Sequence, residues 1–156
     1  MRLVSVAIKL ILAAAVVWPT IVLGHEFSPE EQEVWDFIEQ CQEAFKEESE
    51  AAHDCFHDDF LGWQYPDLVP RNAEAQRKFA RLQFETTEIR GQDVRPVGIR
   101  IYGRFAVAHY YVQSVVRGQD GQDIEQRNRW TDILLKEKGR WYWIGDHGGA
   151  ITVSQP

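Results

Sequence analysis

The segment from Ile124 to His147 constrains the fold of this 156-residue chain more than any other. Two runs rich in aromatic and β-branched residues flank a polar turn that ends in glycine, which is typical of a β-hairpin. A type I turn followed by a left-handed glycine suits residues 137–139, whereas a two-residue loop would give Lys138 a positive φ that a side chain with a Cβ resists. The sequence therefore predicts a three-residue loop, with Lys136 opposite Arg140.

This loop determines the predicted cross-strand partners, and residues directly opposite each other share a face of the sheet. The pairs are Leu135 with Trp141, Ile133 with Trp143, Thr131 with Gly145, and Arg129 with His147. One face is thus predicted to begin apolar at the turn and to end in three polar residues, which is how small-molecule pockets are usually lined. A register slip of one residue would turn all these side chains to the other face.

The N-terminus has the composition of a secretory signal peptide. Arg2 and Lys9 precede an apolar run, and small or tolerated residues at 22–24 precede a cleavage point. The run is shorter than the ~20 residues that a spanning helix needs. An uncleaved anchor is the alternative, which Pro19 and the lack of a stop-transfer pattern disfavour. We expect residues 1–24 to be removed, residues 25–156 to form a single domain, and the mature protein to be secreted or periplasmic.

The charge balance excludes two classes of partner. Residues 1–24 contain two basic residues and no acidic one, so their removal takes the formal net charge from −7 to −9. An acidic chain is a poor ligand for nucleic acid or for an anionic membrane surface. We therefore predict neither nucleic-acid binding nor membrane association after cleavage.

Two cysteines, Cys41 and Cys55, leave two interpretations open. Export permits a disulfide between them, while both positions also suit buried free thiols if helix geometry keeps them apart. His53 and His57 are spaced as zinc ligands on a helix, but no third ligand is evident, so no metal site is predicted. The chain has no Gly-rich phosphate loop, nucleophile elbow or CxxC motif, and no cofactor is predicted.

Local signals give the order of the elements. Ser28, Pro29 and Glu31 form the start of a helix with a capping box, which we expect to end near Glu48. A short second helix is predicted over 51–60, and a third from its cap at Asn72 to about residue 86. An extended piece at 61–66 separates the last two. A turn at 91–93 then leads into strands at 94–102 and 105–116 and the hairpin, with Pro96 demoting the first strand to an edge or a bulge.

Helices that precede a meander of strands indicate an α+β domain. We predict a curved antiparallel β-sheet wrapped around three N-terminal helices, forming a cone with an internal cavity. At this level the chain resembles the nuclear transport factor 2-like superfamily, in its SnoaL-like and ketosteroid-isomerase-like branch. The segments that carry the resemblance are Phe60–Trp63, Arg104–Tyr110 and Arg129–Trp141 with Asp146-His147, and the likeness spans Glu30 to about Ala150.

The resemblance implies a fold more than an activity, because the superfamily includes isomerases, dehydratases, cyclases, epoxide hydrolases and non-catalytic binders. Ketosteroid isomerases carry an aspartate base after the second helix and a tyrosine–aspartic acid oxyanion hole. Here that stretch offers Trp63, Gln64 and Tyr65, with Asp67 the nearest acid, so we do not transfer the mechanism. The superfamily also implies a homodimer through the outer sheet face, where the predicted register places Trp130 and Tyr142.

The candidate site residues follow from the predicted register. His147 and Arg129 form the candidate acid–base pair, since a nearby guanidinium keeps an imidazole neutral and available. The candidate ligand-binding residues are Trp63, Tyr65, His109, Tyr111 and Thr131. His109 and Tyr111 share a face that either lines the pocket or points outward. Trp63 and Tyr65 either border the cavity mouth or simply fill the core.

Two functions are compatible with these residues. The first is an exported module that binds a small apolar ligand in an apolar cavity without catalysis. The alternative is an isomerase, dehydratase or hydrolase acting on a small apolar or polycyclic substrate, with His147 as the acid–base group and Tyr111 or Tyr65 as a proton-donating hydrogen bond. The predicted register directs Asp132 and Asp146 away from His147, and the lack of a carboxylate beside it slightly favours the binding module.

Overall fold

The computed structural model describes residues 26–65 and 67–151, and the predicted signal peptide lies outside these residues. In chain order the elements are α1 (Pro29–Lys46), the short 3-10 helix η1 (Glu50–Cys55), β1 (Leu61–Gln64), β2 (Arg71–Asn72), α2 (Ala73–Thr86), β3 (Thr87–Tyr102), β4 (Phe105–Gly118), β5 (Asp123–Glu137) and β6 (Arg140–Ala150). Within the described part of the chain, no helix has the length and apolar character needed to cross a membrane.

The two long helices begin where the sequence predicts. The Ser28 hydroxyl accepts a hydrogen bond from the Glu31 amide, and the Glu31 carboxylate accepts one from the Ser28 amide, which completes the capping box of α1. The Asn72 side chain caps α2 by accepting from the Ala75 amide. The predicted second helix is shorter than expected and is a 3-10 helix that ends at Cys55.

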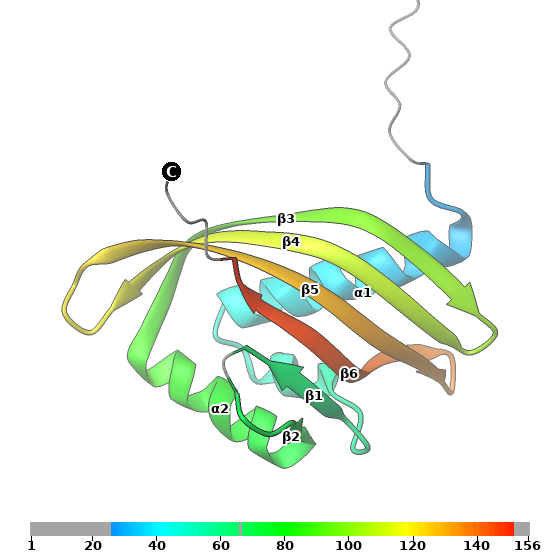
Figure 1. Cartoon of the computed structure of the whole chain (residues 1–156), viewed down its shortest axis with the longest axis horizontal. Coiled ribbons are helices and arrows are strands. Elements are labelled where there is room, and N and C mark those ends of the chain that lie inside the picture. The colour runs from blue at the N-terminus through cyan, green and yellow to red at the C-terminus, as the bar shows by residue number, and fades with distance from the viewer. Residues whose placement is uncertain (1–25, 66, 152–156) are drawn as a thin grey trace, which may run out of the picture.

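The strands form one open, curved sheet in the order β2-β1-β6-β5-β4-β3, with α1 lying across one face (Figure 1). The four long strands are the predicted antiparallel meander, but β1 pairs in parallel with β6, so the sheet is mixed. The predicted turn at 91–93 is wrong, because β3 starts directly after α2 at Thr87. Pro96 lies on this edge strand beside a register shift, as its missing N–H predicts.

The hydrophobic core fills the space between α1, η1 and the inner face of the sheet. Trp143 packs edge-on against Phe37 with ring centroids 5.7 Å apart, and it lies 5.2 Å from the Phe56 ring. Val34 and Ile38 of α1 are fully buried beneath them. The α+β class and the curved sheet around helices are therefore confirmed.

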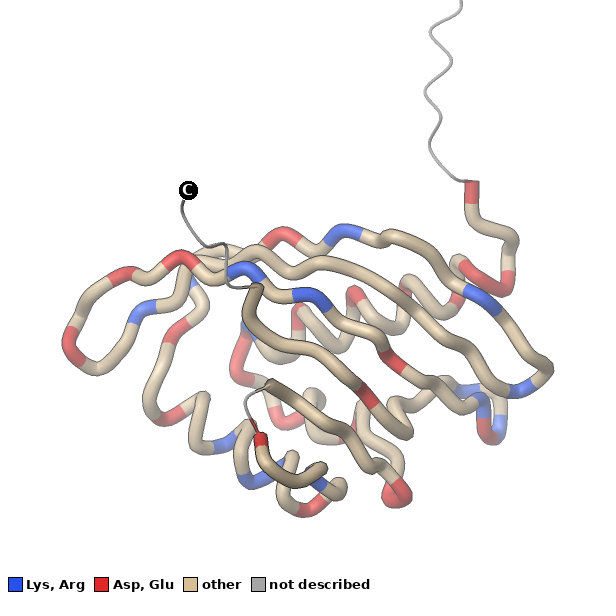
Figure 2. The backbone as a smooth tube through the Cα atoms, in the orientation of Figure 1, with Lys and Arg blue, Asp and Glu red and all other residues tan. Residues whose placement is uncertain are grey.

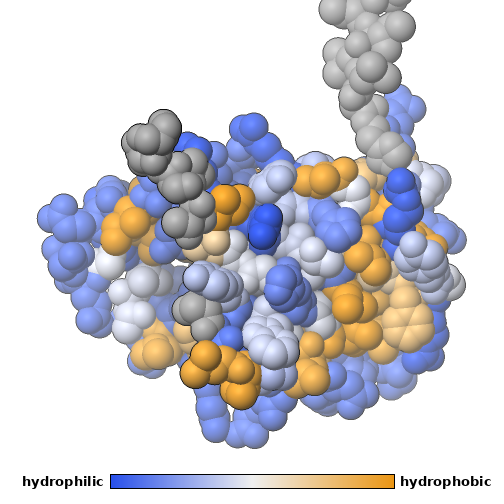
Figure 3. Space-filling model, in the orientation of Figure 1, coloured by the Kyte–Doolittle hydropathy of each residue, from blue (hydrophilic) through white to orange (hydrophobic). Residues whose placement is uncertain are grey.

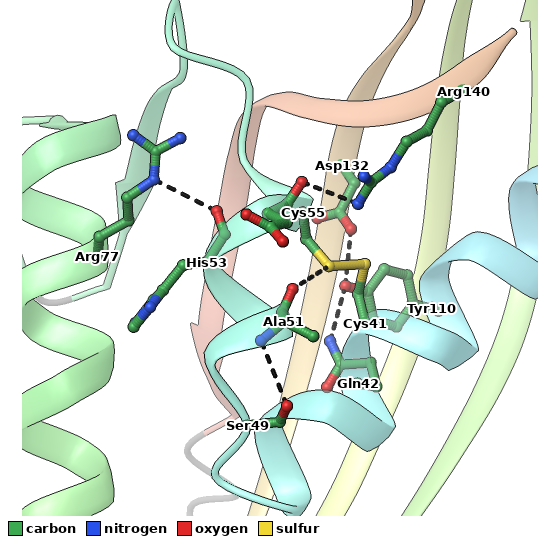
Figure 4. The surroundings of a disulfide bond; sticks show 11 residues. Cys41, Gln42, Ser49, Ala51, His53, Cys55, Arg77, Tyr110, Asp132 and Arg140 are labelled. Atoms are coloured by element: carbon green, nitrogen blue, oxygen red, sulfur yellow. Dashed lines mark hydrogen bonds between the residues drawn. A yellow bond between two sulfur atoms is a disulfide. The ribbon is translucent and has the colours of Figure 1, made fainter.

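Cys41 and Cys55 are joined by a disulfide that ties α1 to η1 (Figure 4). Their Cα atoms are 6.1 Å apart, within the range that a disulfide spans. Each cysteine is followed by a residue that lines the cavity described below, Gln42 and Phe56. The crosslink thus holds two parts of the cavity wall at a fixed separation.

The turn of the β5–β6 hairpin differs from the prediction. Glu137 pairs with Arg140, which leaves a two-residue loop of Lys138 and Gly139 with φ values of +51° and +81°. Positive φ at both positions defines a type I′ turn, whose twist matches that of the flanking strands. The strain at Lys138 that argued against this loop is therefore present and is outweighed by the pairing of the two long strands.

This turn reverses the faces predicted for β5. Trp141 now pairs with Lys136 and Trp143 with Leu134, so the even-numbered residues of β5 face inward with the two tryptophans. A β-bulge at Ile144 then changes the alternation on β6, and beyond it the even-numbered residues face inward there too. Asp132 and Asp146 consequently lie opposite each other on the inner face, where the sequence analysis had expected neither.

The turn type can be tested by replacing Lys138→Asn, because asparagine followed by glycine is a preferred type I′ pair. Asparagine tolerates positive φ better than lysine, so we expect a gain of about 0.5–1 kcal/mol in the free energy of unfolding. Chemical denaturation of the wild type and the variant measures this difference. In a three-residue loop Lys138 would have negative φ, and the substitution would bring no gain.

Candidate functional site

A cavity of about 210 Å³ opens between α2, the end of α1 and the inner face of strands β3 to β6. Its lining combines amide side chains, aromatic rings, a few aliphatic and hydroxyl groups and three acidic residues. The residues are Gln42, Phe45, Glu48, Phe56, Gln64, Gln76, Phe79, Gln83, Phe84, Thr87, Ile89, Gln92, Tyr110, Val112, Ser114, Val116, Gln126, Asn128, Trp130, Asp132, Trp143 and Asp146.

The lining is more polar than the apolar wall predicted from the sequence. Six glutamines and one asparagine contribute carboxamides, and no Lys, Arg or His is among the described residues that line the cavity. The volume also lies below the roughly 300–1,000 Å³ of typical ligand pockets. A single-ring compound fits these dimensions better than the predicted polycyclic one.

Three ionisable groups lie on neighbouring strands of the inner face. Asp132 of β5 is directly opposite Asp146 of β6, and two acidic positions are visible side by side on these strands (Figure 2). Tyr110 of β4 is opposite Trp130, two residues from Asp132, so it reaches Asp132 diagonally. The Tyr110 hydroxyl donates a 2.7 Å hydrogen bond to Asp132 Oδ2.

Asp132 and Tyr110 are both only 2% exposed, and this burial dominates their acid–base behaviour. Burial raises the pKa of Asp132 well above its usual range, and the negative charge of Asp146 raises it further. Hydrogen bonding from Tyr110 and, to a smaller extent, from Trp143 opposes that shift without cancelling it. Burial and the neighbouring Asp132 also raise the pKa of Tyr110 well above 10. Burial therefore favours the protonated form of both groups.

A line of hydrogen bonds supports Tyr110 from the helix side. Gln92 of β3 donates to the Gln42 carbonyl oxygen at 3.1 Å, and the Gln42 amide donates to the Tyr110 hydroxyl oxygen at 3.3 Å. Gln42 follows the bridged Cys41, so the disulfide anchors the point from which this amide reaches the tyrosine (Figure 4). The tyrosine accepts from one side and donates to Asp132 on the other, which fixes the direction of its proton.

Asp146 has a different environment from that of Asp132. Gln64 of β1 donates a 3.1 Å hydrogen bond to Asp146 Oδ2, while Oδ1 is buried without a hydrogen-bond partner among the described residues. A Cβ added to Gly62 would lie only 2.1 Å from Oδ1, so the glycine makes room for this oxygen. Burial raises the pKa of Asp146 to about 6, against the opposing effects of Gln64 and Arg71.

Arg71 orients this carboxylate indirectly. Its guanidinium donates to the Gln64 carbonyl oxygen at 3.2 Å, lies 3.7 Å from the centroid of the Phe79 ring, and forms an ion pair with Asp67 in which Nε is 2.7 Å from Oδ2. Gln64 is thereby held with its amide directed at Asp146. The arginine also lowers the pKa of Asp146 through its charge.

The arrangement is suited to acid–base chemistry. Asp146 is close to half-ionised near pH 6 and can accept a proton, while Asp132 is neutral and can donate one. Pairs of ionisable groups whose environments separate their pKa values are typical of catalytic acid–base sites. Among the described residues, no group of three or more His, Cys, Asp or Glu side chains is placed to hold a metal ion.

The residues predicted from the sequence to form the site gather on the outer face instead. Trp63, His147, Thr131 and His109 are successive cross-strand partners, and His109 Nδ1 lies 2.9 Å from the Thr131 hydroxyl. Arg129 pairs with Tyr111 in the adjacent row. The inward orientation predicted for His147, Arg129 and Thr131 was wrong, because of the type I′ turn and the bulge at Ile144.

The aromatic residues of the β1 segment do not line the cavity either. Trp63 is 50% exposed and donates its indole N–H to the Asp67 carbonyl, and Tyr65 is 70% exposed. Between them, Gln64 points inward, as strand alternation requires. The residue that the prediction passed over is thus the one that contacts the candidate base.

Sequence reasoning also missed Tyr110, Asp132 and Asp146 as site residues. A signal for two of them was present, because an aspartate in the middle of an apolar strand is unusual unless it has a partner or a function. Asp132 lies between Thr131 and Ile133, and Asp146 follows Gly145 in an aromatic strand. The correct hairpin register would have paired them.

The outer face carries exposed apolar side chains among polar ones (Figure 3). Phe105, Tyr111 and Ile133 are each more than two-fifths exposed there. Of the two residues predicted for a dimer interface, Trp130 lies in the cavity wall and Tyr142 contacts His57. The homodimer remains a prediction that sedimentation analysis can test, with this apolar group as its interface.

Comparison with known proteins establishes the fold. Neither a protein-family model nor a curated protein matches the chain. A ketosteroid isomerase-like protein from Erwinia carotovora atroseptica superposes with a TM-score of 0.72 at 13% identity, covering 81% of this chain and 100% of that one. A putative scytalone dehydratase from Novosphingobium aromaticivorans superposes with a TM-score of 0.67 at 15% identity, covering 79% of this chain and 85% of that one. An NTF2-like protein from Cytophaga hutchinsonii superposes with a TM-score of 0.65 at 16% identity, covering 80% of this chain and 100% of that one. The chain therefore has the nuclear transport factor 2-like fold.

Asp146→Asn should change the pH dependence of stability. The pKa of Asp146 rises from 3.8 to about 6 on folding, so the native state binds the proton more tightly and loses stability as the pH rises through this window. The loss is on the order of 3 kcal/mol above pH 6, at ~1.4 kcal/mol per pKa unit. Between pH 4 and pH 7 the wild type should lose most of this free energy of unfolding, and the variant should not lose it. Denaturation of both proteins at the two pH values measures the difference.

Asp54→Asn is the matched control, because the Asp54 side chain is exposed and makes no hydrogen bond or ion pair with the other described residues. The difference in free energy of unfolding between Asp54→Asn and the wild type should be the same at both pH values. If the difference in free energy of unfolding between Asp146→Asn and the wild type is also independent of pH, Asp146 is not buried as described.

Proposed function

We propose that the cavity catalyses proton transfer on a small carbonyl compound, as an isomerase or a dehydratase. One observation carries the proposal: two carboxyl groups face each other in the cavity, one held neutral by burial and the other with a pKa of about 6. This pair supplies the carboxylate that the sequence analysis found lacking. The base role proposed for His147 passes to Asp146, since His147 lies on the outer face.

In the first step, the Asp146 carboxylate removes a proton from the carbon next to the substrate carbonyl. The C–H electron pair forms the enolate double bond, and the carbonyl electron pair moves to the oxygen. Asp132 Oδ2 already accepts from Tyr110, so the proton of neutral Asp132 remains on Oδ1 as a hydrogen-bond donor to that oxygen. Donors placed where negative charge develops stabilise the transition state strongly.

In the second step, the proton on Asp146 is used in one of two ways. Returning it to a different carbon gives an isomer, and delivering it to a β-hydroxyl group releases water and gives an unsaturated product. Atoms and charge balance in both routes without any cofactor. The isomerase-like and dehydratase-like names of the structural neighbours support this class as analogy of fold alone. Hydrolysis, the third activity considered, would require an additional positioned water.

A non-catalytic binding module is the second candidate, and the hydrogen-bond line to Tyr110 favours it. Gln92, Gln42, Tyr110 and Asp132 satisfy one another, as a purely structural buried network does. Asp146 argues for catalysis, since one of its buried oxygens has no partner and its charge is destabilising. Destabilising groups of this kind are common at active sites.

The proposal predicts base-catalysed exchange of carbon-bound hydrogen. We expect the wild type in D₂O to accelerate deuterium incorporation next to the carbonyl of small ketones and hydroxy ketones, followed by NMR. The rate should rise with pH through about 6, since Asp146 acts when ionised. Asp146→Asn should lower the rate by roughly 10²–10⁴-fold.

His147→Ala is the control that separates the two faces of the sheet. It removes the base predicted from the sequence and no residue that lines the cavity. The charge of His147 lowers the pKa of Asp146, so exchange should proceed at close to the wild-type rate with at most a small upward shift of the pH profile. Loss of exchange in His147→Ala, or full exchange in Asp146→Asn, would contradict the assignment. Binding of these compounds without exchange in any form of the protein would favour the binding module.

We also propose that the protein is exported and that residues 1–24 are removed. The disulfide between Cys41 and Cys55 supports this, because such bonds persist in oxidising compartments. Amino-terminal sequencing of protein from the exported fraction should begin at His25 or within a few residues of it. A full-length chain retained in the membrane fraction would contradict cleavage.

A further inference from the structure

We infer that the ligand of this cavity is a small, neutral, hydroxylated compound rather than an apolar or anionic one. The inference rests on the proposed function only in taking the same cavity as its site. It adds the chemical class of the ligand, which follows from polar groups that the acid–base pair does not use.

The wall formed by β4 and β5 presents polar groups without protein partners. Ser114 is buried and Asn128 is partly buried, and neither side chain has a hydrogen bond among the described residues. They come from adjacent positions on the inner face, because Val112 pairs with Asn128 and Ser114 with Gln126. Their polar atoms are accessible from the cavity, so a ligand or water that enters it can supply the partners that the protein does not.

A second group on the same inner face, in β6, points to the same need. The indole N–H of Trp143 is buried in the cavity wall and lacks a well-formed hydrogen bond, although it is close enough to the Asp132 carboxyl to lower its pKa. A tryptophan N–H donates only, an amide both donates and accepts, and a serine hydroxyl does both. A compound with several hydroxyl groups can pair with all three kinds, whereas a hydrocarbon would leave them unsatisfied and lose the associated free energy.

The charges around the cavity exclude an anion. Asp146 is ionised above pH 6, Glu48 lies at the rim, and no basic side chain lines the space among the residues described. A ligand carboxylate or phosphate would lose its water and meet like charge. A cationic ligand is attracted less strongly than the presence of two aspartates suggests. Burial keeps Asp132 neutral, and the positive charge of Arg71 already acts on Asp146.

Aromatic rings complete the complementarity. Phe79, Phe84 and Trp130 line the cavity together with Trp143, so a ring compound can rest its C–H face on them while its hydroxyl groups reach the strands. A small neutral sugar or cyclic polyol with a carbonyl or hemiacetal group has this combination of surfaces. An extended polycyclic molecule would exceed the cavity of about 210 Å³.

Ligand-observed NMR with four matched sets of probes tests the class. The neutral set is D-xylose, D-glucose and myo-inositol, the cationic probe is D-glucosamine, the anionic probe is D-glucuronate, and the apolar set is cyclohexanone and 1-indanone. We expect saturable binding within the neutral set. We expect D-glucuronate to bind at least tenfold more weakly than D-glucose, and the apolar set to bind more weakly than the best neutral probe.

Asn128→Leu and Ser114→Ala remove the unpartnered groups and should each weaken binding of the neutral set, the first by tenfold or more. Gln113→Leu is the matched control, because it makes the same kind of change on the outer face of the neighbouring strand and should leave binding unchanged. Thermal unfolding of each variant shows whether it remains folded. Ser114→Ala keeps the test decisive if the leucine variant unfolds.

Each remaining outcome overturns the inference. These are no binding by any neutral probe, tightest binding by an apolar or anionic probe, D-glucosamine binding more than tenfold more tightly than D-glucose, or unchanged binding in both cavity variants. The proposed function fails separately. Neutral probes that bind without deuterium exchange would contradict catalysis alone, and exchange confined to apolar ketones would contradict the ligand class alone.

Discussion

The burial of the Asp132 carboxyl group is the constraint on which the rest of the site depends. A charged carboxylate at this depth would cost several kcal/mol, so the group is held neutral and bonded to Tyr110. Gln42 fixes the tyrosine from α1, and the strand pairing brings Asp146 opposite. Because Asp132 is neutral, it does not repel a negative charge on Asp146, whose pKa stays moderate. The two acids therefore have different roles.

The sheet supplies the positions, and the surrounding elements supply the environment. Asp146 would be an ordinary strand residue if β1 did not lie in parallel beside β6 and bring Gly62 and Gln64 against it. That short strand is the part of the fold that the antiparallel prediction did not include. The base is thus created by a contact between segments that are 82 residues apart in the sequence.

Local sequence signals predicted the architecture well because they act locally. The capping box at Ser28, the cap at Asn72 and the edge position of Pro96 each follow from hydrogen-bonding groups within a few residues. The face of each strand depends instead on register, which one residue reverses. The loop chosen for Lys138 and Gly139 was wrong, and the bulge at Ile144 was not predicted although Gly145 beside it is a weak signal for one. The histidine was therefore placed in the cavity and the aspartates outside it.

The disulfide has a consequence for when the site is assembled. Its 14-residue loop joins the two cysteines that precede Gln42 and Phe56, and both of these residues belong to the cavity wall. The crosslink anchors the helix end beside Tyr110 covalently, whereas the opposed aspartates are positioned by the hydrogen bonds of the strand pairing. The separation of Gln42 and Phe56 in the cavity wall is therefore set by a covalent bond that only oxidation can form.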